Sequence, residues 1–404
     1  MLQREDKKML DKFVMAPPDP ILGLTEAFLK DSNPDKINLG VGVYKDNFNK
    51  TPIFKTVKKA ESILLEKEQT KSYLPISGSQ EFCDLVQQLV LGKNSPCIQE
   101  KRIATVQTAG GTSALRVFAD LIRTNTEIKK IWMSNPTWEN HGKIFQLAGF
   151  ETESYPYYNA ETHDLDWDKM ISTIEAIPEG DILLLHGCCH NPTGIDLNKE
   201  QWTTIANIVK EKRILPLIDF AYQGLGDGLE EDALGVRIIA DIVPEVFICS
   251  SFSKNFGLYN ERCGALIGIC SDYDTCQKVL SQIKVVIRTN YSNPPAHGAY
   301  IVQTILGSNE LRNEWEKEVE EMCTRIKNMR NLFVEKLKEK GITQDFSFIE
   351  KQRGMFSFSG LKKEQVLRLR EEFSIYIVNS GRINVAGITT TNIDRLAEAI
   401  SKVL

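Results

Sequence analysis

Strongly apolar runs alternate with amphipathic segments along the middle of this chain, and this alternation limits the folds that it can adopt. Four apolar runs, each ending abruptly in polar residues, lie at residues 129–138, 180–194, 213–224 and 245–255. Between two of them, residues 198–213 carry apolar side chains at helical spacing. Apolar strands that alternate with amphipathic helices are typical of a mostly parallel sheet covered by helices on both faces. The sequence therefore predicts an α/β fold.

The length of 404 residues is more than one ordinary core needs, which favours a large domain and a smaller one. Residues 309–341 form a long amphipathic stretch without an internal Gly or Pro, and this pattern predicts one helix that ends at Gly341. We expect this helix to lead into a smaller α/β domain, with short strands near residues 346–360 and 375–387 and a contribution from residues 36–44. The predicted division is a small domain over 15–48 and 312–404, and a large domain over 49–311.

Bulk composition excludes several classes of function. A formal net charge of −5 gives no field that would attract nucleic acid or an acidic membrane surface. No apolar run approaches the roughly 18 residues of a membrane span, and the first 13 residues mix acids and bases without the apolar core of a secretion signal. Nine cysteines in a chain of this length fit reduced thiols better than a disulfide framework. We therefore expect a cytoplasmic protein.

Polar side chains gather where the four predicted strands end. Because ligands bind beyond the carboxyl ends of parallel strands, these residues are expected to line one site. In chain order they are Asn135, Pro136 and Trp138, then His186 and Asn191, then Asp219 and Tyr222, and finally Ser251, Ser253 and Lys254.

The residue types at these strand ends point to a particular cofactor. A lysine amine such as that of Lys254 attacks carbonyls only when it is deprotonated, and burial near a cation such as Arg262 lowers its pKa. Gly111 and Thr112 open an amphipathic helix, whose first amides can bind an anion. Asp219 could keep a pyridine nitrogen protonated, so that the ring withdraws electrons. A lysine, a phosphate pocket and a buried acid together predict pyridoxal 5'-phosphate.

Each of these features also has an ordinary structural interpretation. A lysine is most often a solvated surface residue, Asp219 could cap a helix, and Trp138 could pack in a core instead of stacking on a cofactor ring. The His-Gly-Cys-Cys-His run at residues 186–190 invites a metal interpretation, but it lacks the ligand spacing of zinc sites. We predict buried thiols there and no metal.

Several longer motifs resemble those of one family. The segments SNPTWENH (134–141), HGCCHNPTG (186–194), IDFAYQG (218–224), SSFSKNFGLYNERCG (250–264), RTNYSNPPAHG (288–298), GMFSFSG (354–360) and NSGRINVAG (379–387) occur in order. Together they resemble the class I aspartate aminotransferases, fold type I enzymes that use pyridoxal phosphate. The similarity runs from Pro17 nearly to the C-terminus. The first dozen residues match no pattern of the family, in which this region forms an arm over the partner subunit; residues 1–14 are the expected arm.

The resemblance implies a role for each residue around the cofactor. Lys254 would form the internal aldimine and move the proton during the reaction, Asp219 would pair with the pyridine nitrogen, and Tyr222 would complete the catalytic set. Asn191 and Tyr222 would hydrogen-bond the phenolic oxygen, Trp138 would stack on the ring, and His186 would lie behind Asp219. The phosphate would be held by Ser251, Arg262, Thr112 and the amides of Gly110 and Gly111, together with Tyr73 of the partner subunit.

The resemblance also implies the substrates. Arg382 would bind the α-carboxylate as a bidentate fork, and Arg288 of the partner subunit would bind the distal carboxylate. Gly42, Trp138 and Asn191 would complete the substrate site. The implied reaction is the reversible ping-pong transfer of an amino group between L-aspartate and 2-oxoglutarate, giving oxaloacetate and L-glutamate, in a homodimer with shared sites. Asn135–Pro136 and Asn191–Pro192 would be cis.

Three other functions are compatible with parts of this pattern. An aromatic-preferring aminotransferase of the same class could keep both arginines. A Schiff-base lyase or aldolase could use Lys254 without a cofactor. A non-catalytic binding or scaffold protein would need none of these side chains.

Overall fold

A computed structural model describes residues 9–17 and 20–404 of the chain. At its centre lies a seven-stranded sheet in which every neighbouring pair is parallel except the two pairs that involve β10. In spatial order the strands are β2 (Ile103–Thr108), β10 (Gly264–Ile269), β9 (Val246–Ser251), β8 (Leu215–Phe220), β7 (Ile182–His186), β3 (Lys130–Asn135) and β4 (Glu151–Pro156). The predicted α/β fold with a mostly parallel sheet is confirmed.

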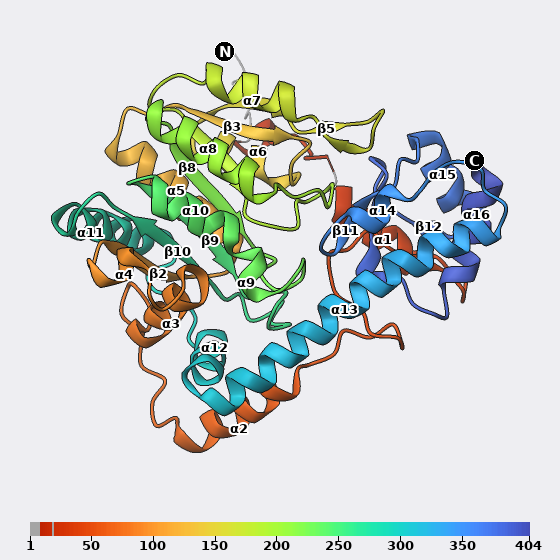
Figure 1. The fold of residues 1–404 in the computed structure, drawn as a ribbon. Helices are drawn as coiled ribbons and strands as arrows, with labels where there is room; N and C mark the ends of the chain where they lie inside the picture. Colours follow the sequence, from red (N-terminus) through yellow and green to blue (C-terminus); the bar gives the residue numbers. More distant parts are fainter. Residues whose placement is uncertain (1–8, 18–19) are drawn as a thin grey trace, which may run out of the picture.

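Helices cover both faces of this sheet because its central strands are apolar on both sides (Figure 1). Leu184 and Leu217 point into one core, which α5 and α11 close, while Leu183 and Ile218 point into the other, closed by α8 and α10. The helices of this part are α2 (Lys55–Lys67), α3 (Gln80–Leu91), α4 (Pro96–Gln99), α5 (Gly111–Asn125), α6 (Asn140–Leu147), α7 (Trp167–Ala176), α8 (Lys199–Glu211), α9 (Leu229–Asp232), α10 (Leu234–Ile242), α11 (Tyr273–Asn290) and α12 (His297–Gly307). A small hairpin joins β5 (Tyr158–Asn159) to β6 (Asp164–Leu165).

A separate hydrophobic core unites the two ends of the chain. Strand β1 (Ile37–Asn38) pairs in parallel with β12 (Ile375–Tyr376), and β11 (Phe356–Phe358) pairs in antiparallel with β13 (Arg382–Asn384). The remaining elements are α1 (Pro20–Lys30), α14 (Phe348–Lys351), α15 (Lys363–Phe373), the 3-10 turn η2 (Val385–Gly387) and α16 (Ile393–Val403). Ile37 and Leu39 are buried in this core beside residues from the second half of the chain. The sequence separation of more than 300 residues is bridged by packing, not by local structure.

The long helix α13 (Asn309–Glu339) connects the two cores (Figure 1). Ser308 caps its first turn, and Gly341 follows its end with φ +74°. Trp315 and Val319 in its first half pack in the large core, whereas Phe333 and Val334 in its second half pack in the small one. The helix is therefore shared between the two bodies, and the domain bounds given above stay a prediction.

Two stretches at the ends of the chain carry less regular structure. Of the expected arm, residues 1–8 lie outside the described part, and Met9–Lys12 form one 3-10 turn, η1. In the 346–360 region, the first half folds as the short helix α14 where a strand was expected. Asp345 accepts a hydrogen bond from the Ser347 backbone N–H and so turns the chain. Within residues 9–17 and 20–404, no helix is both long and apolar enough to cross a bilayer.

Candidate active site

The carboxyl ends of the central parallel strands open into a cavity of about 220 Å³. His186 at the end of β7 lies opposite Asp219 on β8, so the strand register itself brings these two side chains together. The start of α5 and the turn after β9 close the cavity on the other side. Of the residues predicted from the sequence, its lining includes Gly42, Gly111, Thr112, Trp138, His186, Asn191, Asp219, Tyr222, Ser251, Lys254, Arg262 and Arg382.

Lys254 lies on the turn that follows β9, enclosed by protein except where it faces the cavity. Burial lowers its pKa, Asp219 opposes the shift, and the neighbouring charge of Arg262 adds to it. Its Nζ lies 4.9 Å from the centre of the Tyr222 ring, and in the described chain it forms no ion pair. The side chain is thus a buried amine with a lowered pKa, the form that a nucleophile or a proton carrier requires.

Asp219 is held as a carboxylate by a histidine. His141 on α6 is fully buried, and its Nε2 lies 2.9 Å from Asp219 Oδ2. Burial raises the pKa of Asp219, but the hydrogen bond from His141 and the charges of His141 and Lys254 outweigh it, so the net pKa is lowered. The cavity therefore contains a buried, ionised acid facing a buried amine.

His186 is neutral and belongs to a row of rings behind Asp219. Burial and the charge of His141 lower its pKa to about 3. Its Nδ1 accepts a hydrogen bond from the Asn191 backbone N–H, and its ring stacks on that of His190 at 4.2 Å. Thr137 Oγ1 lies 2.8 Å from His141 Nδ1 and 3.2 Å from His186 Nε2. These contacts fix the orientation of the histidine that contacts Asp219.

A cation without a carboxylate partner lies across the cavity from Lys254. Arg382 on β13 is 3% exposed, and it donates from Nη2 to Gly40 O at 2.6 Å and from Nη1 to Asn191 Oδ1 at 3.3 Å. Asn191 in turn donates to the Tyr222 hydroxyl at 3.5 Å. Among the described residues no acid forms an ion pair with Arg382, and its buried Nε lacks a hydrogen-bond partner. A ligand carboxylate would satisfy it.

The opposite end of the cavity is suited to an anion. Ser251 and Ser253 are buried there, and Arg262 donates to Ser253 Oγ at 3.4 Å. Gly110, with φ +84°, precedes α5, and the first two residues of this helix, Gly111 and Thr112, line the cavity with the N-terminal amides available to an anion. A Cβ at Gly110 would lie 2.5 Å from Arg262 Nη2, so the turn and the guanidinium pack closely. This arrangement is a cup of serine hydroxyls, a guanidinium and helix amides.

The sequence profile of the family described as Aminotransferase class I and II matches residues 34–400. The chain belongs to this family. It is similar to the aspartate aminotransferase of Escherichia coli strain K12, with 56% identity over 98% of this chain and 100% of the relative. It is also similar to an aromatic-amino-acid aminotransferase of Pseudomonas aeruginosa, with 47% identity over 96% and 98% of the two chains.

The similarity in fold to solved structures also extends over nearly the whole chain. A crystal structure of the aromatic-amino-acid aminotransferase from Burkholderia pseudomallei, described as covalently bound to pyridoxal phosphate, has a TM-score of 0.96 and 50% identity, covering 98% of this chain and 100% of that one. The expected cis peptide bonds of the family motifs, Asn135–Pro136 and Asn191–Pro192, are both present.

Two residues that the family resemblance assigned to the site lie elsewhere in the single chain. Tyr73 is 91% exposed, and Arg288 near the end of α11 is exposed as well. Both line a second cavity of about 330 Å³ with Leu74, Ile76, Ser292 and Asn293. Arg288 Nη1 donates to Ser292 Oγ at 2.5 Å. Within one chain these two residues are brought to each other but not to Lys254.

Cys188 and Cys189 lie close to Asp232, and hydrogen bonds and burial oppose metal binding by this cluster. Cys188, Cys189 and Asp232 place one ligand atom each within 4.8 Å of one another. However, the Asp232 carboxylate already accepts backbone N–H groups of Gly224, Gly226 and Asp227. Burial raises the pKa of the Cys189 thiol to about 12 and that of Cys188 well above its ordinary value. The absence of a metal stays a prediction that these contacts support.

Sequence reasoning missed several residues of the site, of which three bear on its chemistry. His141 is the hydrogen-bond partner of Asp219, a position for which only His186 was proposed. Tyr259 and Phe356 also line the cavity. All three occur within the motifs that carry the family resemblance, so the signal was present. The spacing of a motif, however, does not tell which of its side chains turns toward a ligand.

Proposed function

We propose that this protein is an aspartate aminotransferase, which transfers an amino group reversibly between L-aspartate and 2-oxoglutarate and yields oxaloacetate and L-glutamate. Three bacterial relatives with the name aspartate aminotransferase share 52–56% of its residues over 98% of the chain. The aromatic relative of Pseudomonas aeruginosa is less similar, at 47%. The chemistry of the cavity agrees with this assignment.

The cofactor is pyridoxal 5'-phosphate, and the residues of the cavity fit it. The anion cup of Ser251, Ser253, Arg262 and the α5 amides matches a phosphate in charge and donor type, and Gly110 leaves no side chain in the way. Trp138 offers a flat surface beside the cavity. When bound, the cofactor supplies a pyridine ring that withdraws the electron pair released from the substrate α-carbon.

Lys254 and Asp219 divide the proton chemistry between them. Because its pKa is lowered, Lys254 Nζ can take the substrate α-proton and return it to another atom. Asp219 stays ionised beside His141 and so can hold a proton on a ring nitrogen. Tyr222, whose pKa is raised by burial, keeps its hydroxyl proton and can donate it to the phenolic oxygen of the cofactor.

Substrate carboxylates are recognised by arginines. Arg382 is proposed to bind the α-carboxylate through its planar fork, with Asn191 and Gly42 beside it. Arg288 of the partner subunit is proposed to bind the distal carboxylate, and Tyr73 of the partner subunit to complete the phosphate cup. This division explains why dicarboxylates of four and five carbons would be preferred.

One observation carries the proposal: an amine with a lowered pKa, an ionised acid and an unpaired guanidinium line the same cavity. The test is transamination by the purified holoenzyme with L-aspartate and 2-oxoglutarate, beside the Lys254→Ala variant. We expect activity in the first and none in the second. Activity that survives in Lys254→Ala, or none in the wild type with its cofactor bound, would overturn the assignment. An inactive wild type would also revive the scaffold interpretation or a lyase that uses Lys254 without a cofactor.

An aromatic-amino-acid aminotransferase is the alternative function. It is favoured by the overall likeness to the Burkholderia pseudomallei enzyme. The ratio of kcat/KM for aspartate to that for phenylalanine separates the two. Near-equal values would identify the aromatic enzyme, whereas a large excess for aspartate supports our proposal.

We further propose a cytoplasmic homodimer. All nine cysteines are buried and free, as expected for a reducing compartment. Exposed apolar side chains at Leu10, Phe13, Val14 and Met15 would lie against a partner in such a dimer. Sedimentation of the active enzyme as a monomer would contradict the dimer.

A further inference from the structure

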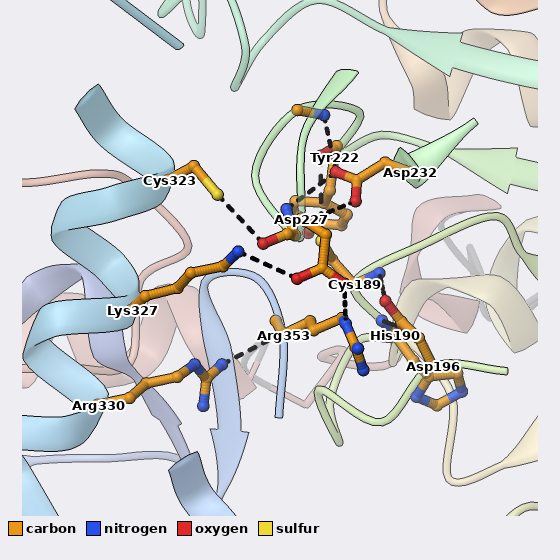
Figure 2. Close-up of polar contacts among 12 residues, drawn as sticks. Cys189, His190, Asp196, Tyr222, Asp227, Asp232, Cys323, Lys327, Arg330 and Arg353 are labelled. Carbon is orange, nitrogen blue, oxygen red and sulfur yellow. Dashed lines mark hydrogen bonds and ion pairs between the residues drawn. The ribbon is translucent and has the colours of Figure 1, made fainter. Parts of the chain in front are cut away.

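Arg330 is a buried arginine on the second half of α13, outside the cavity lining. It is 1% exposed, and its guanidinium bonds only to backbone carbonyl groups. Nη2 donates to Gly354 O at 2.7 Å, Phe356 O at 2.5 Å and Arg353 O at 3.2 Å, and Nη1 donates to Ile349 O at 3.3 Å. Figure 2 shows this side chain reaching from α13 toward the segment that holds Arg353.

A buried cation without an acid partner is costly, and its position therefore requires an explanation. Among the described residues no carboxylate lies within ion-pair distance of Arg330. Burial lowers its pKa to about 10. The four carbonyls that replace a counter-ion all belong to residues 349–356, a segment that we call the strap. Together they fix the strap to the helix.

The strap is also fixed on its other side, against the loop that carries Asn191. Arg353 N donates to Gly194 O at 2.6 Å. A Cβ at Gly354 would lie 2.3 Å from Cys189 Cβ, so the two backbones approach as closely as a glycine allows. Arg353 and Lys327 both form ion pairs with Asp227 (Figure 2). The strap is thus clamped between α13 and the active-site loop.

The last residue of the strap touches the substrate site directly. The ring of Phe356 lies under the Arg382 guanidinium, with 4.4 Å from Cζ to the ring centre, and it meets Tyr222 edge-on. A Cβ at Gly42 would lie 2.7 Å from the same ring. The backbone carbonyl of Phe356 is held by Arg330, while its side chain supports Arg382.

We propose that Arg330 is a positioning residue for substrate binding: it holds the Phe356 carbonyl so that the Phe356 ring stays in contact with the Arg382 guanidinium. This inference rests on the proposed function, in which Arg382 binds the α-carboxylate. Arg382 donates only two hydrogen bonds within the described chain, to Gly40 O and Asn191 Oδ1, and its Nε has no hydrogen-bond partner there. The ring is a further contact that holds the guanidinium in place. Without Arg330, the strap loses up to four hydrogen bonds, made by two guanidinium nitrogens, and the position of the ring against Arg382 is no longer fixed.

The variants Arg330→Met and Arg330→Lys test the proposal in the holoenzyme. Met keeps an unbranched apolar chain but removes every donor, and Lys keeps the charge with fewer donors in a different geometry. We expect Arg330→Met to raise KM for both aspartate and 2-oxoglutarate about tenfold, with kcat changed by less than about threefold. Arg330→Lys should fall between this variant and the wild type. Cofactor content and the absorption spectrum of the bound cofactor should match the wild type.

Arg395→Met is the control. Arg395 on α16 also donates to a backbone carbonyl, Phe373 O at 2.7 Å, and also has a buried Nε without a partner in the described chain. Unlike Arg330 it is partly exposed and forms an ion pair with Asp35 at 3.8 Å, and it does not contact the strap. A purely structural effect would lower the stability of both variants and leave KM unchanged in both. An unchanged KM in Arg330→Met, or an equal rise in Arg395→Met, would overturn the proposal.

A double-mutant cycle keeps the test decisive if Arg330→Met does not fold. Phe356→Leu removes the ring but leaves the carbonyl, so Arg330→Lys and Phe356→Leu should act through the same contact. We expect the double variant to have a KM no higher than the worse single variant. Fully multiplicative effects would show that Arg330 acts elsewhere. Failure of the proposed function would look different from failure of the Arg330 proposal, because the wild type itself would then lack transamination activity.

Discussion

His141 Nε2 donates a hydrogen bond to Asp219 Oδ2 at 2.9 Å, and both side chains are shielded from solvent. This pair keeps an acid ionised inside a cavity where burial alone would raise its pKa. The acid in turn faces Lys254. The His141–Asp219 hydrogen bond explains how one site can contain both a negative carboxylate and an amine with a lowered pKa.

The first prediction is that His141→Ala lowers kcat about 10- to 100-fold, because a charged group loses one buried hydrogen bond. The pKa of Asp219, lowered in the wild type, should rise when its main partner is removed. The acid limb of the pH–rate profile should therefore shift to higher pH. His163→Ala, which alters a histidine that contacts Tyr158 outside the cavity, is the control. An unshifted acid limb in His141→Ala would count against the pair.

The second prediction concerns the pH at which Lys254 becomes reactive in the cofactor-free protein. Since burial lowers its pKa, Nζ should lose its proton at a lower pH than exposed lysines. An acylating reagent added at increasing pH should therefore label Lys254 first, as read by mass spectrometry of peptides. Arg262→Met should move its labelling midpoint to higher pH, because a neighbouring positive charge is lost. Labelling of Lys254 in step with surface lysines would refute this.

The third prediction compares two glycines with left-handed backbones. Gly194 has φ +71°, and a Cβ there would lie 2.6 Å from Phe356 O; Gly180 has φ +85°, with nothing within 4 Å. Gly180→Ala should cost only the backbone strain, about 1 kcal/mol of unfolding free energy. Gly194→Ala should cost about 1–3 kcal/mol more and raise KM for aspartate. Urea unfolding and steady-state kinetics measure both effects, and equal losses in the two variants would contradict the predicted clash.

The fourth prediction is that Arg382→Lys lowers kcat/KM for aspartate and 2-oxoglutarate about 100-fold. A lysine cannot make two parallel hydrogen bonds to one carboxylate, and the contact of the guanidinium with the Phe356 ring is also lost. Cofactor binding should be unaffected, because Arg382 lies away from the anion cup. A variant with wild-type kcat/KM would exclude Arg382 from carboxylate binding.

Much of the fold followed from the sequence because its signals are local and repeated. The apolar run around Leu184 and Leu217 predicts buried parallel strands, and residues 198–213 predict the helix that became α8. The Asn198 capping box fixes the start of α8 almost where the pattern placed it. By contrast, the pairing of Ile37 with Ile375 depends on packing across the whole chain, which no local pattern contains.

The site was predictable for a different reason, and only in part. Strand ends bring Asp219, His186 and Lys254 to one edge as soon as the strands are known to be parallel. The partner of Asp219 could not be chosen this way, because His141 lies on a helix whose orientation is set by tertiary packing. Similarly, Phe356 is placed at the cavity by contacts between distant segments, the pairing of β11 with β13 and the hydrogen bond from Arg330, which no local pattern contains.

The last prediction tests whether two subunits share each site. Tyr73 and Arg288 lie together in a second cavity and not beside Lys254 of their own chain. If Arg288 serves the partner's site, Arg288→Ala and Lys254→Ala homodimers should each be nearly inactive. Mixing the two chains under conditions that allow subunit exchange should then create heterodimers in which one site holds both Lys254 and Arg288. With random exchange, about a quarter of the wild-type site number should return, since half of the dimers are mixed and each mixed dimer has one intact site out of two.

Two further mixtures serve as controls. Mixing Arg288→Ala with Arg382→Ala is an independent second pair that should also recover activity. Mixing Lys254→Ala with Arg382→Ala should restore nothing, because Lys254 and Arg382 line the cavity of the same chain. No recovery in the first two mixtures would show that Arg288 acts within its own subunit or not at all. Recovery in the last mixture would show instead that Lys254 and Arg382 of one chain do not serve the same site.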